Sequence, residues 1–306
     1  MPIFTGSNFI LDVGRESAFN DGVTSGFDMG SLGAGLQLST FTMKNDFNPI
    51  YGVNQRTPLG WYTKGLKVDF SADFYACDDS DTAKSWLDFV LTGSGGSSTT
   101  PNTSWSSGTT INSAYGQIQS YLSAYDMYTV SGIVFDSAKI NVQQGELVKV
   151  SLSGTGTQET TSAPTTSISV TPPSDVLSWK DATVEIGATL ASVPTPIESL
   201  DMTISTSKEQ IYGIGSDIYQ GYYLKEFKVE GSVNIYHDSG LIGDIFGYGI
   251  SSSDSAVSLT DNLKLTIGDY TFNIIGLIRN EGEMNIPPVK EVMDKISFMG
   301  TAMTVS

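Results

Sequence analysis

The sequence predicts a mostly β protein with two tandem β-sandwich or β-barrel domains, each carrying one flanking helix. Three observations predict it. One segment occurs twice without a gap, apolar and polar residues alternate in both halves, and a Thr/Ser/Pro-rich stretch lies between the halves. A chain of 306 residues is also long enough for two domains of ordinary size.

The repeated segment covers residues 42–75 and recurs at residues 203–236, a constant offset of 161. Of these 34 positions, 11 are identical. Both copies contain Ile-Tyr-Gly and then Lys-Val, and both end in Tyr. We therefore expect domains at residues 1–157 and 176–306, joined by a Thr/Ser/Pro-rich linker at residues 158–175.

Alternation within the repeat predicts strands with one buried and one wet face, because successive side chains of a strand point to opposite faces. The apolar positions are Val68, Phe70, Ala72 and Phe74 in the first copy, and Val229, Val233 and Ile235 in the second. The polar positions are Asp69, Ser71, Asp73, Glu230, Ser232 and Asn234.

One helix is expected in each half. Residues 78–93 begin with Asp and Ser, continue with an apolar run and stop at Gly93, a pattern typical of a capped helix. Residues 237–249 are its shorter, Gly-rich counterpart. The first helix is followed by a Gly/Ser/Thr-rich stretch at residues 93–110, which we expect to be a mobile loop with an exposed Trp105.

Motifs for catalysis, metals and cofactors are nearly absent. His237, Asp238 and Ser239 are neighbours, whereas a catalytic triad is assembled from separated segments. The acidic run at residues 78–81 lacks the glycine and distal glutamate of a calcium loop, so a helix start explains it. With one cysteine, Cys77, and one histidine, neither a disulfide nor a structural zinc is expected. No enzyme activity and no cofactor are predicted.

Charge and hydropathy limit the partners. The net charge of −17 disfavours tight binding to nucleic acid or to anionic lipid. Neither a secretory signal nor an apolar stretch long enough to span a membrane is visible, so no membrane partner is expected.

Each half resembles the tail tube proteins of long-tailed bacteriophages and archaeal viruses. The resemblance lies in the Ile-Tyr-Gly turn before a long strand, in KVDFSADFY and KVEGSVNIY, in the helix expected after them, and in a closing strand that ends in Gly-Thr. It implies tail-tube-type β-sandwich domains with a flanking helix, six to a ring, with rings stacked into the tube through which the genome passes. Some siphovirus tube proteins carry the fold twice, which implies three chains in a ring with pseudo-sixfold symmetry.

The resemblance also implies a location in the virion tail, after assembly in the host cytoplasm. The partners would be further copies of the chain, other tail proteins (terminator, tape measure, baseplate), and viral DNA that passes without specific binding. We expect an acidic lumen lined by Asp69, Ser71, Asp73, Glu230, Ser232 and Asn234; the alternative is that these polar faces form the outer skin of the tube. Contacts between rings or subunits are expected at Gly93, Ser97, Trp105 and Thr110.

Two alternatives stay open at this point. The first is another tube-like component, such as a tail terminator, a baseplate hub or a secretion-tube subunit. The second is a β-sandwich module that binds carbohydrate. Its candidate aromatic residues are Trp61, Tyr62, Tyr222 and Tyr223, although aromatic residues more often anchor a core or a subunit interface.

Overall fold

A computed structural model describes most of the chain: residues 9–16, 18–20, 32–53, 56–78, 85–95, 102–120, 127–161, 175–187, 191–192, 197–214, 216, 219–236, 262–275, 278–285 and 293–306. These residues are mostly in strands, and they form two sheets. The prediction of a mostly β fold is therefore confirmed.

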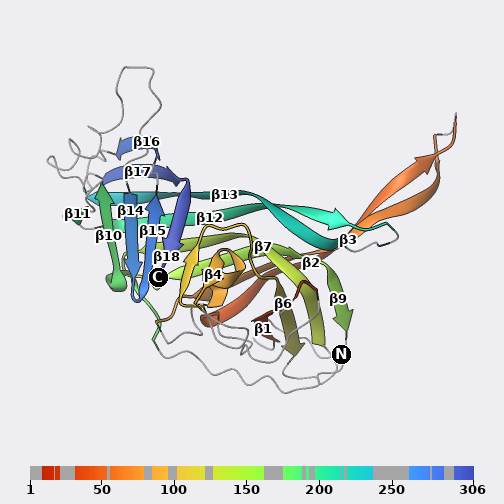
Figure 1. The fold of residues 1–306 in the computed structure, drawn as a ribbon, viewed down its shortest axis with the longest axis horizontal. Coiled ribbons are helices and arrows are strands. Elements are labelled where there is room, and N and C mark those ends of the chain that lie inside the picture. Colours follow the sequence, from red (N-terminus) through yellow and green to blue (C-terminus); the bar gives the residue numbers. More distant parts are fainter. Residues whose placement is uncertain are drawn as a thin grey trace.

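The large sheet contains strands from both halves of the chain (Figure 1). The first half supplies β2 (Ala34–Tyr51), β3 (Pro58–Tyr75), β8 (Lys149–Gly156) and β7 (Met127–Gln143). The second half continues with β12 (Ile197–Tyr212), β13 (Tyr219–Tyr236), β17 (Met293–Gly300) and β16 (Ile278–Asn285). The halves meet where β7 pairs antiparallel with β12, so one sheet runs across both.

Three further strands attach to this sheet through β7. Strands β6 (Ala114–Ser120) and β9 (Gln158–Thr161) pair with β7 directly, and β1 (Phe9–Arg15) pairs with β6. Strand β9 falls in the stretch predicted as a linker. Its four residues form a strand there by pairing with the first part of β7. The predicted domain limits themselves stay a prediction.

The smaller sheet has the order β11 (Ala191–Ser192), β10 (Ala182–Gly187), β14 (Asn262–Ile267), β15 (Tyr270–Ile275), β18 (Ala302–Val305), β5 (Ser104–Ser106) and β4 (Thr92–Ser94). Most of it comes from the second half, but β4 and β5 come from the first. β5 pairs with β18. A three-residue 3-10 helix, η3 (Trp179–Asp181), precedes β10.

The repeated segments form two long hairpins with one register. β3 and β13 begin and end at positions 161 apart, and β2 and β12 end at Tyr51 and Tyr212, also 161 apart. The bulge after Asp46 in β2 recurs after Ser207 in β12. Because bulges fix strand register and twist, the hairpins share backbone detail as well as length.

The closing strands also correspond, at an offset of 144. In the first half Phe135 of β7 lies opposite Gly154 of β8, and a bulge follows before Ser137. In the second half Arg279 of β16 lies opposite Phe298 of β17, and a bulge follows before Glu281. Strand β7 thus corresponds to β15 and β16 together, and β8 corresponds to β17.

Phenylalanine and glycine exchange places between the two halves. Phe70 of β3 lies opposite Gly154 of β8, whereas Gly231 of β13 lies opposite Phe298 of β17. Both phenylalanine rings are buried. Each glycine lies close to backbone: a Cβ would come within 2.5 Å of the Val134 oxygen at Gly154 and within 2.2 Å of the Asp201 oxygen at Gly231.

The predicted flanking helix of the first half is wrong. It is only a five-residue 3-10 helix, η2 (Ser85–Phe89), and the described part of the chain contains no longer helix. Five consecutive residues, 86–90, are buried there, whereas an α-helix beside a sheet buries one stripe. A run of consecutively buried residues therefore suits a tight turn inside the core. The second predicted helix, residues 237–249, lies outside the described residues.

Candidate assembly surface

The six predicted lumen residues lie on one face of the large sheet. Residues directly opposite each other on adjacent strands share a face. One such row runs across five strands, from Asp73 through Ser151, Lys139 and Thr203 to Glu230. The alternate residues of these strands, including Val68, Phe70, Val229 and Val233, are buried on the opposite face.

Lysines compensate the carboxylates of this polar face. Lys44 forms an ion pair with Asp69, and Lys228 forms one with Glu230. Lys149 Nζ lies 3.6 Å from Asp73 Oδ2. The alternating positions of β3 and β13 alone suggest an acidic face. The lysines that neutralise it lie on a neighbouring strand or two residues earlier on the same strand. The described part of the face is therefore rich in paired charges and hydroxyl groups.

The predicted contact loop is partly packed into the protein itself. Trp105 is only 2% exposed, contrary to the expected exposed aromatic, because β4 and β5 extend the smaller sheet and carry this ring into the core. Gly93 pairs with Trp105 across these strands. Thr110 is exposed, and its carbonyl accepts a hydrogen bond from the Thr92 hydroxyl. Ser97 lies outside the described residues.

A buried carboxylate holds this segment in place. Asp88 in η2 accepts hydrogen bonds through Oδ1 from the Trp105 indole N–H and the Asn102 amide, each at 2.6 Å. Its Oδ2 lies 3.2 Å from Arg15 Nη1. Asp88 therefore joins β1, η2 and β5, which are distant in the sequence.

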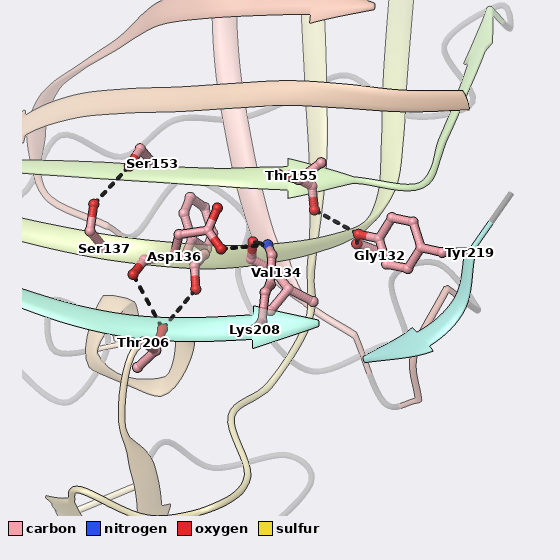
Figure 2. A network of polar contacts seen from close by, with 10 residues as sticks. Gly132, Val134, Asp136, Ser137, Ser153, Thr155, Thr206, Lys208 and Tyr219 are labelled. Carbon is pink, nitrogen blue, oxygen red and sulfur yellow. Dashed lines mark hydrogen bonds and ion pairs between the residues drawn. The ribbon is translucent and has the colours of Figure 1, made fainter. Parts of the chain in front are cut away.

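The junction between the halves is built by the β12–β13 hairpin lying along β7. Beyond the paired part of β12, Thr206 donates to the Phe135 carbonyl at 3.1 Å. The Tyr219 hydroxyl at the start of β13 lies 2.8 Å from the Gly132 carbonyl and 2.7 Å from the Thr155 carbonyl (Figure 2). Burial raises the pKa of Tyr219 well above its usual value, so the hydroxyl stays protonated and can donate.

An ion pair lies within this junction. Lys208 Nζ is 3.1 Å from Asp136 Oδ1 and also donates to the Val134 carbonyl (Figure 2). The Lys208 side chain is 5% exposed. Burial lowers the pKa of Lys208, while the Asp136 charge opposes that effect. Lys208 stands at the bulge of β12 in its pairing with β13, and Asp136 stands at the bulge of β7 in its pairing with β8.

The three aromatic candidates for carbohydrate whose side chains are described do not form one cluster. Trp61 is 62% exposed on the β2–β3 hairpin. Tyr222 instead packs against Phe19, with ring centroids 5.5 Å apart, and its hydroxyl donates to the Ile111 carbonyl. The Tyr223 hydroxyl donates to Glu209, and the Tyr62 side chain is not among those described. The described rings belong to two different hairpins.

Sequence reasoning missed Asp88, Asp136 and Lys208. Asp88 stands in the apolar run 86–91, and an acidic residue inside such a run is a usable signal for a buried polar centre. Asp136 likewise interrupts the apolar run 133–135. Lys208 gives no such signal, because it follows a run of Ser and Thr.

Metal-ligand clusters and membrane-spanning helices were expected to be absent, and the structure bears on them only over its described residues. No cluster of three acidic, His or Cys side chains suited to a metal occurs among the described residues. Residues 79–81 and 237–239, which carry two of the motifs considered above, lie outside them. No described helix is long and apolar enough to cross a membrane.

Comparison with known proteins identifies a family. No curated protein matches the chain. A family model described as phage tail tube protein matches residues 13–300, and it thus spans both halves and the junction between them. The chain therefore belongs to the phage tail tube protein family and is a structural component of the virion tail.

Proposed function

We propose that this chain carries the tube domain twice and that three copies close into a ring with a pseudo-sixfold wall. Stacked rings would form the tube that conducts viral DNA. The β7–β12 junction carries this proposal, because it joins the two halves by extending one sheet. If the halves are equivalent, the same junction can form again between chains.

The two offsets specify the second junction. Subtracting 161 from β12 gives β2, and adding 144 to β7 gives β16. These are the two ends of the eight-strand order in the described part of the large sheet. Pairing β2 of one copy with β16 of the next would protect both edges and allow the sheet to close. The five pairs that follow from β7–β12 are Thr40 with Asn285, Phe41 with Met284, Thr42 with Glu283, Met43 with Gly282 and Lys44 with Glu281.

The exposure of equivalent residues supports this pairing. Met43 is 54% exposed, although it lies opposite the buried Val68. Its equivalent, Ile204, is 0% exposed because the first half covers it. Trp61 is likewise exposed where its equivalent Tyr222 packs on the first half. Exposed apolar residues at positions that are buried in the other copy indicate a surface for a partner.

Whether the polar face points into the lumen or outward depends on where a closed ring has space for the layer that covers the apolar face. The apolar face is covered by elements of the chain itself, among them η2 and parts of the smaller sheet. Such a layer needs the greater space outside the ring, so the polar face with Asp69, Ser71, Asp73, Glu230, Ser232 and Asn234 would line the lumen. Paired charges and short hydroxyl side chains would offer passing DNA few free cations to bind.

The partners and place of assembly follow the same proposal. The β2–β3 hairpin projects far from the body (Figure 1), and exposed Ile50, Tyr51 and Val53 lie at its tip. We assign this tip, together with exposed Thr110 of the loop, to contacts within the tail. Those contacts would be with further copies of the chain and with the terminator, tape measure and baseplate. Assembly would take place in the host cytoplasm.

A cysteine pair tests the closure. The variant Thr42→Cys with Glu283→Cys places two thiols on directly opposite residues of the proposed β2–β16 pairing. Opposite residues of antiparallel strands have Cα atoms about 4.5–5.5 Å apart, within the range that a disulfide spans. After oxidation, a non-reducing gel should show chains linked two and three at a time, with no larger species.

Two controls define the result. The native Cys77 is buried, so the unmodified protein should show no linkage. Thr42→Cys with Asn285→Cys shifts the register by two residues and should crosslink far less. A ladder that extends to six chains would contradict the three-chain ring, and absence of any linkage in assembled protein would contradict the β2–β16 junction.

A further inference from the structure

The two junctions of the proposed ring share a backbone but differ in chemistry at their bulges. In the junction within the chain, the bulge positions carry Lys208 and Asp136, which form the ion pair with Lys208 buried. The offsets place Phe47 and Asn280 at the same positions of the junction between chains. The ion pair is thus a property of one junction and not of the tube fold in general.

The charged residues along the paired strands also differ between the two junctions. Within the chain, the β7 strand contributes Lys139 and the hairpin contributes Asp201, with Lys139 Nζ 3.3 Å from Asp201 Oδ1. Asp201 also accepts a hydrogen bond from the Asn141 amide at 2.8 Å. Between chains, β16 contributes Glu281 and the hairpin contributes Lys44 on the opposite residue. Outside the bulges, the hairpin therefore carries the acid and the strand the base within the chain, whereas the hairpin carries the base and the strand the acid between chains. The Lys208–Asp136 pair at the bulge has the opposite order.

We propose that these differences make the two junctions mutually exclusive. The second-half hairpin then docks only on a first half, and the first-half hairpin docks only on a second half. Asp136 and Lys208 are the main determinants, and the exposed pairs add to the distinction. This inference rests on the proposed ring and explains what keeps its halves alternating. Without such a code, two first halves or two second halves could dock together and open the ring into branched or irregular polymers.

The cost of each wrong pairing can be read from the residues. A first-half hairpin on a first half would set position 47, a phenylalanine, in place of Lys208, so Asp136, whose side chain is 44% exposed, would lose its cation. A second-half hairpin on a second half would bring Lys208 to position 280, where an uncharged asparagine replaces Asp136. It would also bring Asp201 next to Glu283, since that position corresponds to Lys139. An unpaired buried charge and like charges side by side both reject a partner.

Exclusion of the wrong junction can be measured with a second cysteine pair. Thr42→Cys with Lys139→Cys links chains only when a first-half hairpin docks on another first half, because residue 139 corresponds to residue 283. In the otherwise unmodified protein this linkage should be negligible. Adding Asp136→Asn and Lys208→Phe gives both junctions the same bulge residues, and we expect this linkage to rise at least tenfold.

The reciprocal change keeps the test valid if that variant folds poorly. Phe47→Lys with Asn280→Asp adds the ion-pair residues to the junction between chains and leaves the native pair untouched, and it should raise the same linkage. A matched control removes an ion pair away from both junctions: Asp73→Asn with Lys149→Phe should leave the linkage unchanged.

The outcomes separate the two proposals. If neither folded variant raises the 42–139 linkage, alternation does not depend on this pair and the inference is overturned. If the 42–283 linkage is absent from the unmodified background, the ring itself fails. A rise in the 42–139 linkage together with a fall in the 42–283 linkage would support both.

Discussion

Replacing Asp88 with alanine is expected to lower the free energy of unfolding by about 3–5 kcal/mol, the usual effect of removing one member of a buried ion pair. The substitution leaves the Arg15 guanidinium without the carboxylate that lies 3.2 Å away. It also removes the acceptor of the buried Trp105 N–H. Denaturant unfolding at equal protein concentrations measures the loss, because assembly adds to apparent stability.

A half-exposed ion pair of the smaller sheet supplies the control. Glu185 Oε2 lies 3.1 Å from Lys264 Nζ, and both side chains are about 30% exposed. Glu185→Ala should therefore cost no more than about 1 kcal/mol. Equal losses for Asp88→Ala and Glu185→Ala would show that the Asp88 carboxylate does not hold β5 and η2 together.

Reversing the charge of Asp69, Asp73 and Glu230 together to lysine should slow genome delivery by about tenfold or more at low salt, if the polar face lines the lumen. Each change adds two positive charges and also deprives Lys44, Lys149 or Lys228 of its carboxylate. Free ammonium groups bind phosphates by releasing counterions, so added salt should restore the rate. Dye-monitored DNA ejection from assembled virions at several salt concentrations measures this effect.

The neutral variant Asp69→Asn, Asp73→Asn and Glu230→Gln separates added charge from lost pairing. It frees the same three lysines but adds only half of the positive charge, so its delay should be intermediate. Tubes of normal length with unchanged ejection in both variants would place this face on the outside of the tail.

Alternation along single strands was enough to predict the buried and the wet faces of the long hairpin strands, but not the single sheet that joins both halves. The residues at alternate positions of β3 and β13 lie on the predicted faces, because side-chain direction in a strand depends only on local backbone geometry. The repeat also aligned the hairpins correctly, since both copies keep their length and bulges.

The contacts between distant segments were not predictable in the same way. Trp105 lies in a Gly/Ser/Thr-rich stretch that favours a loop, yet β5 pairs with β18 about 200 residues later. Likewise Lys208 reads as an exposed residue, because its burial depends on which strand lies beside β12. The η2 segment was mistaken for an α-helix because its acidic start resembles a cap, although its consecutive burial suits a shorter turn.

The exchange of Phe70 and Gly154 for Gly231 and Phe298 bears on how the two halves can still trade parts. Substituting the β13 sequence for β3 would set glycine opposite Gly154 and empty the volume that the Phe70 ring fills. The opposite graft would set phenylalanine opposite Phe298 and press a Cβ against the Asp201 carbonyl. We therefore expect exchange of a whole strand pair between the halves to keep this packing, and exchange of a single strand to disrupt it.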